Sequence, residues 1–157
     1  MFGRSVRRGF TVIDVIVTTG LVGVVTAFGA PELQEALRRR MTQSAADQFT
    51  TAHALARATA IQYGRVAQLH VDAATRRFWI EVDTSADAIG QRATVWYERT
   101  LTDPGVQMSS DRTLLCFDAR GLALDVAPCE SGNAQVVFTA IQAADTVRTT
   151  VLGKVLR

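Results

Sequence analysis

The chain is poor in the residues from which most metal and enzyme sites are built. Its 157 residues include only two cysteines and two histidines. Two cysteines without suitably placed histidines cannot form a zinc site. The sequence also lacks Gly-x-Ser-x-Gly, His-Glu-x-x-His and a glycine-rich loop that opens a helix, as phosphate sites require. We therefore expect no enzymatic activity, no cofactor, no metal and no catalytic residue.

An excess of one charge is absent as well. The formal net charge is +2, which is too small to indicate a nucleic-acid-binding protein. With 48% hydrophobic residues the chain is also too apolar for a disordered protein, and its length fits one domain. The first nine residues contain Arg4, Arg7 and Arg8 and no acidic residue, so the rest of the chain has a net charge of −1.

A long apolar segment follows this basic start. Residues 10–30 contain one charged side chain, that of Asp14. As a helix they would extend about 32 Å, enough to cross the hydrocarbon core of a bilayer. The arginines before the segment favour a cytoplasmic N-terminus, whereas residues 38–40, all arginine, oppose it from a greater distance. A cleaved signal peptide ending near Gly29 is the alternative, although the segment is longer than usual and Asp14 interrupts it.

Asp14 is unusual because a carboxylate inside a membrane helix costs a few kcal/mol and tends to have a partner. If the chain were cut before Phe10, the new α-amine would lie near Asp14 of the same chain or of a neighbour. The two charges would attract strongly in a medium of low dielectric constant. The alternative is a solitary acid that reaches the lipid headgroups.

Residues 8–14, Arg-Gly-Phe-Thr-Val-Ile-Asp, resemble the processing site of type IV pilins and type II secretion pseudopilins. The resemblance implies that a prepilin peptidase cuts after Gly9, that Phe10 is then N-methylated, and that Asp14 acts in assembly with other subunits. The family usually has Glu at the position of Asp14. Pro31 also matches a position where the family often has proline, and we expect it to kink or locally interrupt the helix.

Apolar residues continue at helical spacing beyond Pro31. They predict one helix from about residue 10 to residue 63, ended by Gly64 at the position after the C-cap. His53 within it is expected to be a surface or packed histidine rather than a ligand. The stripe consists of Leu37, Met41, Ala45, Phe49, Ala52, Ala56, Ala60 and Tyr63.

After Gly64 the pattern changes to short segments rich in β-branched and aromatic residues, separated by turns. The fold class is therefore α+β, with a long N-terminal helix packed on an antiparallel β-sheet domain. The expected domains are a leader (1–9), a transmembrane half of the helix (10–30), a periplasmic half (31–64) and the β domain (65–157). The expected strands are residues 66–71, 77–82, 94–100, 113–118, 122–126, 135–140 and 146–152.

The chain also resembles the GspH/FimT group of pseudopilins and minor pilins. The similar segments are the alanine-rich residues 52–61 with Gly64, the turn at residues 117–121 and the Gly-Lys-Val at residues 153–155. The resemblance implies a minor pilin or pseudopilin of a type II secretion or type IV pilus machine. Such a subunit would be a single-pass protein of the bacterial inner membrane, with a periplasmic domain, before it enters a filament.

Two features of the β domain each allow two interpretations. Cys116 and Cys129 are expected to form a disulfide in an oxidising compartment, the alternative being two packed thiols. The C-terminal region resembles the basic tail with which some FimT-type proteins bind DNA, but it has only three basic residues: Arg148, Lys154 and Arg157. We favour instead an edge strand kept soluble by its charges. The alternatives to a filament subunit are thus a DNA-binding minor pilin and a secreted soluble domain.

Overall fold

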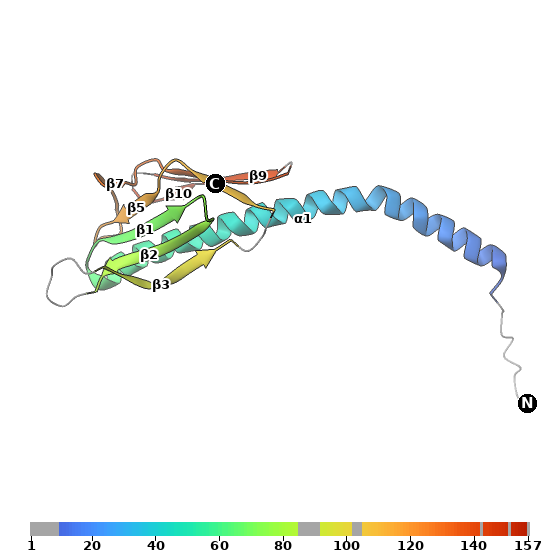
Figure 1. The fold of residues 1–157 in the computed structure, drawn as a ribbon, viewed down its shortest axis with the longest axis horizontal. Helices are drawn as coiled ribbons and strands as arrows, with labels where there is room; N and C mark the ends of the chain where they lie inside the picture. The colour runs from blue at the N-terminus through green and yellow to red at the C-terminus, as the bar shows by residue number, and fades with distance from the viewer. Residues whose placement is uncertain (1–9, 85–91, 102–104, 142, 151, 157) are drawn as a thin grey trace, which may run out of the picture. The chain divides into compact units, whose positions relative to one another are not determined.

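The structure, a computed structural model, describes residues 10–84, 92–101, 105–141, 143–150 and 152–156 (Figure 1). It divides the chain into two compact units, Met1–Ala36 and Leu37–Arg157. One helix and ten strands are described: α1 (Val12–Tyr63), β1 (Ala67–Asp72), β2 (Arg77–Asp83), β3 (Arg92–Thr100), β4 (Gln107–Ser110), β5 (Leu114–Phe117), β6 (Ala123–Val126), β7 (Cys129–Glu130), β8 (Gln135–Ala140), β9 (Ala143–Thr149) and β10 (Val155–Leu156).

Helix α1 begins at Val12, two residues after the predicted start, because Thr11 caps it. The Thr11 hydroxyl accepts a hydrogen bond of 3.3 Å from the Asp14 N–H, and the Thr11 N–H donates one of 3.0 Å to the Asp14 carboxylate. This reciprocal pair is a capping box. The helix continues through Pro31, so the predicted local interruption is wrong, while the kink stays a prediction.

The helix ends where the sequence predicts. Gly64 has a φ of 64°, the left-handed conformation that glycine adopts without strain. The N–H of Arg65 bonds to the carbonyl of Ala60 and the N–H of Gly64 bonds to that of Ile61. These two bonds form a Schellman motif, which satisfies the last carbonyl groups of the helix.

The strands form two antiparallel sheets. The larger has the order β3-β2-β1-β5-β6-β7, and the smaller has the order β10-β9-β8-β4. Within the unit Leu37–Arg157, both sheets lie against α1 (Figure 1). The predicted α+β class with an antiparallel β domain is therefore confirmed.

The core lies between the helix and the two sheets. Phe49 of α1 contacts Phe78 of β2 and Phe138 of β8, with ring centroids 5.9 and 6.1 Å apart. Five of the buried helix positions are alanines, whose small side chains let the strands approach closely: Ala45, Ala46, Ala52, Ala56 and Ala60. One helical face thus joins both sheets into a single core.

The ends of the predicted stripe are wrong. Leu37, Met41 and Tyr63 are exposed, and the buried part of this face runs only from Thr42 to Ala60. The sheets therefore cover a shorter part of α1 than its apolar spacing indicates.

The strand prediction missed β4, β7 and β10, and β9 ends at Thr149 rather than at residue 152. The sequence of β4 is Gln-Met-Ser-Ser, which has no β-branched residue and is held in place by its pairing with β8. A turn from Thr150 to Gly153 then reverses the chain into β10. Residues 85–91, between β2 and β3, lie outside the described residues.

Candidate functional site

The first half of α1 has an apolar surface on all sides. Every large apolar side chain described between Phe10 and Val25 is more than half exposed within its own unit. This part of α1 is long and apolar enough to cross a membrane, and none of its most apolar window is buried. Such a surface requires either lipid or other apolar helices around it.

Asp14 lies in the first turn of this apolar helix. The Thr11 hydroxyl donates a 2.7 Å hydrogen bond to the Asp14 carboxylate, in addition to the capping-box bonds. The carboxylate is thus held at the positive end of the helix dipole, four residues from Phe10. Thr11 was not among the predicted site residues, although its spacing of Thr-x-x-Asp before an apolar run is a capping signal. Gly9 lies outside the described residues.

Arg57 on α1 contacts two segments that lie far along the chain. Its Nε–H donates a 2.8 Å hydrogen bond to the carbonyl of Gly121, and an Nη1–H donates one of 2.9 Å to that of Gly153. The three segments that carry the GspH/FimT resemblance therefore meet at one guanidinium. This contact was not predicted, because the helical pattern places Arg57 outside the apolar stripe.

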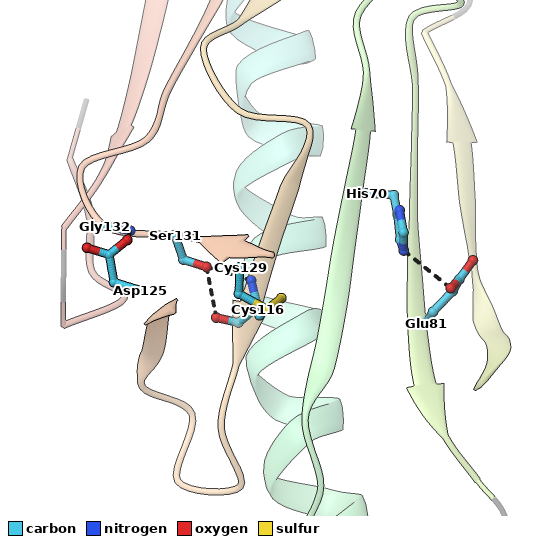
Figure 2. Close-up of a disulfide and its surroundings, with 7 residues drawn as sticks. All are labelled: His70, Glu81, Cys116, Asp125, Cys129, Ser131 and Gly132. Carbon is cyan, nitrogen blue, oxygen red and sulfur yellow. Dashed lines mark hydrogen bonds and ion pairs between the residues drawn. A yellow bond between two sulfur atoms is a disulfide. The ribbon is translucent and has the colours of Figure 1, made fainter. Parts of the chain in front are cut away.

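The predicted disulfide between Cys116 and Cys129 is present, with the two Cα atoms 5.4 Å apart. It joins β5 to β7 next to Ser131, whose hydroxyl accepts a 2.6 Å bond from the Cys116 N–H and donates one of 3.1 Å to the Cys116 carbonyl (Figure 2). Disulfide and serine together fix the β6–β7 hairpin to the rest of the larger sheet.

His53 is a packed histidine, as expected. It is 2% exposed, and its ring meets that of Phe117 edge to face at a centroid distance of 4.9 Å. Its Nε2 has no hydrogen-bond partner among the described residues. Burial, with a smaller contribution from the charge of Arg57, lowers the pKa of His53 to about 4. The imidazole is therefore neutral at ordinary pH.

Two carboxylates of the larger sheet, those of Glu81 and Glu98, pair with side chains of neighbouring residues. Glu81 accepts a 2.8 Å hydrogen bond from the Trp79 indole and lies 3.2 Å from Nε2 of His70 (Figure 2). Arg77 pairs with Glu98 on the neighbouring strand. No group of three or more His, Cys, Asp or Glu side chains within the described residues is arranged to hold a metal.

The basic residues near the C-terminus are only partly described. Arg148 on β9 and Lys154 before β10 are exposed, and Arg157 lies outside the described residues. Arg148 is paired with Leu156 across the β9–β10 ladder, as expected for a charged edge hairpin. The DNA contact stays a prediction.

The comparisons with known proteins agree with this architecture. Residues 45–153 match the family described as Type II transport protein GspH. The fold is similar to that of the type IV minor pilin FimU of Pseudomonas aeruginosa, with a TM-score of 0.59 and 14% identity over 75% of this chain and 88% of that one. It is also similar to the minor pseudopilin EpsH from the type 2 secretion system of Vibrio cholerae, with a TM-score of 0.54 and 17% identity over 73% of this chain and 94% of that one.

A comparison with curated proteins finds no match. The family match covers more than half of the chain, and it includes Arg57, the disulfide and both glycine turns. The similar solved structures share the long helix packed on antiparallel sheets. The chain therefore belongs to the GspH family of type II transport proteins and is a GspH/FimT-like minor pilin or pseudopilin.

Proposed function

We propose that this minor pilin or pseudopilin is cut after Gly9, methylated at Phe10 and then moved from the inner membrane into a filament of a type II secretion or type IV pilus machine. Membership of the family implies a structural subunit that assembles with other pilin subunits. The observation that carries the proposal is the exposed apolar half of α1, which begins three residues after Gly9 with Asp14 in its first turn.

Before assembly, residues 10–30 would span the inner membrane with the N-terminus in the cytoplasm. The basic residues of the leader support this orientation, because positive charges are retained on the cytoplasmic side. The prepilin peptidase would act on Gly9 at this membrane surface. The rest of the chain would then lie in the periplasm, an oxidising compartment that suits the disulfide.

During assembly, Asp14 would attract the α-amine that cleavage creates on Phe10 of a neighbouring subunit. An ammonium and a carboxylate interact strongly between packed apolar helices, and the attraction favours one axial position of the incoming subunit. The capping box with Thr11 restricts the carboxylate to the N-terminal turn, where such an amine would arrive. An aspartate is one methylene shorter than the glutamate usual in the family, so the amine must approach closer to the helix.

The test follows processing and incorporation separately in cells that contain the machine. Gly9→Ala should leave the leader attached. Asp14→Ala should be processed normally but be missing from filaments, whereas the matched variant Asp14→Glu should be both processed and incorporated. Wild-type incorporation of Asp14→Ala would contradict the assembly role, and normal cleavage of Gly9→Ala would contradict the processing site.

A further inference from the structure

The guanidinium of Arg57 has no carboxylate partner among the described residues. Its two hydrogen bonds to Gly121 and Gly153 occupy the Nε–H and one N–H of Nη1. A guanidinium has five N–H donors, so three are left without a protein acceptor in the part of the chain that the structure describes. Arg57 is partly exposed, so a group outside the domain can reach these donors.

A cationic residue adjoins each of the two glycines that Arg57 contacts. Arg120 comes directly before Gly121, Lys154 comes directly after Gly153, and both side chains are exposed. Asp118 pairs with Arg120 at 3.0 Å, so these four charged residues have a net positive charge. We call Arg57, Arg120 and Lys154 the cationic patch.

Apolar side chains border the cationic patch. Ile61 is 55% exposed, and its Cδ1 lies 2.9 Å from where a Cβ on Gly121 would be. Leu152, beside Gly153, is 71% exposed. Arginine next to exposed aliphatic side chains is typical of protein–protein interfaces. Surfaces that bind nucleic acids instead collect many cations to neutralise successive phosphates.

We propose that the cationic patch is a docking point for a carboxylate side chain of a neighbouring pilin-class subunit. The proposal rests on the proposed function, because it requires a second subunit packed against this one. The unused N–H donors of Arg57 would bind the carboxylate, for which the planar guanidinium is well shaped, and Lys154 would add positive charge.

The test uses the full chain in cells that carry its machine, with the photocrosslinking residue p-benzoylphenylalanine in place of Leu152. In a matched control the same residue replaces Ile141, which is 70% exposed in the β8–β9 turn. Only the Leu152 position should give a light-dependent adduct with another pilin-class subunit, joined close to an Asp or Glu. Lys154→Glu should lower the adduct yield by about tenfold, whereas Arg148→Glu, at another exposed cation, should not change it.

Replacing the acidic residue nearest the crosslink with Lys should restore the adduct of Lys154→Glu. The docking point would be refuted by an unchanged yield in Lys154→Glu or by an adduct with nucleic acid. Absence of the adduct from a chain that begins at Phe10 and is recovered in filaments would refute it as well. A mature chain that does not begin at Phe10 would instead overturn the proposed function, and the docking point with it.

Discussion

The Nε–H of Arg57 donates a 2.8 Å hydrogen bond to the carbonyl of Gly121, which lies 64 residues further along the chain. The same guanidinium bonds to Gly153, so one side chain of α1 holds the turn after β5 and the turn before β10. Those turns belong to different sheets. Arg57 therefore links the helix, the larger sheet and the smaller sheet at one point.

Replacing Arg57 should destabilise the β domain. Arg57→Ala removes two hydrogen bonds from a charged donor and leaves two carbonyls without their partner, which should lower the free energy of unfolding by about 2–4 kcal/mol. Arg57→Lys keeps the charge but cannot reach both carbonyls in the same geometry, so we expect an intermediate loss. Urea unfolding of the full chain in detergent measures both. Equal stability of Arg57→Ala and the native chain would contradict the linking role.

Three glycines provide a graded test of the Gly121 turn. Gly105→Ala should change the free energy of unfolding by less than about 0.5 kcal/mol, because no atom would contact the new Cβ. At Gly64 the space for a Cβ is equally open, but the residue has a φ of 64°. Gly64→Ala should therefore lower the free energy of unfolding by about 1 kcal/mol. Gly121→Ala combines a φ of 75° with a 2.9 Å contact between the new Cβ and Ile61. It should lower the free energy of unfolding the most of the three. Thermal unfolding gives the order, and any other order would contradict this account of the turn.

His53 should make the β domain sensitive to acid. Its pKa is lowered from 6.5 to about 4 in the folded chain, so the unfolded chain binds more protons between these values. The contribution of His53 to the free energy of unfolding should therefore be fully present above pH 6.5 and fall by about 3 kcal/mol as the pH drops to 4. Thr75 and the N–H of Leu122 hold the pKa values of Asp72 and Asp118 below their usual range, so these carboxyls titrate below this window.

The variant His53→Gln separates this contribution from those of the other titratable groups. The difference in stability between the native chain and the variant should depend on pH only between about pH 4 and 6.5. Urea midpoints at half-unit pH steps provide the measurement. A difference that stays constant across the window would show that His53 is not the group responsible.

The disulfide should contribute to the stability of the larger sheet. Cys116 and Cys129 are 13 residues apart. Closing a loop of that size lowers the conformational entropy of the unfolded chain and should raise the free energy of unfolding by about 3 kcal/mol. The double variant Cys116→Ser, Cys129→Ser should lose that amount, and a reducing agent should affect only the native chain. Identical unfolding of the native chain with and without reductant would be inconsistent with this contribution.

The sequence predicted the helix and the fold class well because their causes are local. Apolar spacing, the turn chemistry and Gly64 all act within a few residues. The same local rules could not find β4, whose strand conformation depends on pairing with β8 more than 20 residues away. They also extended the buried stripe to Leu37 and Met41, since a helical pattern does not show where the covering sheets end.

The candidate site was predictable to a similar degree. Asp14 is recognisable as the single charge in an apolar segment. The disulfide is recognisable because the sequence has only two cysteines. The partner of Arg57 could not be predicted, because backbone carbonyls carry no sequence signal and both acceptors lie more than 60 residues away. The capping role of Thr11 is a local feature, because its spacing to Asp14 alone indicates it.

The most direct test of the central claim is the N-terminal residue of the mature chain, determined by mass spectrometry of the protein recovered from the membrane and from filaments. The account predicts a chain that begins at Phe10 with one methyl group on its α-amine, together with an uncut form in Gly9→Ala. A mature chain that begins near Ala30, after release by a signal peptidase, or one that keeps Met1 in the filament would contradict it.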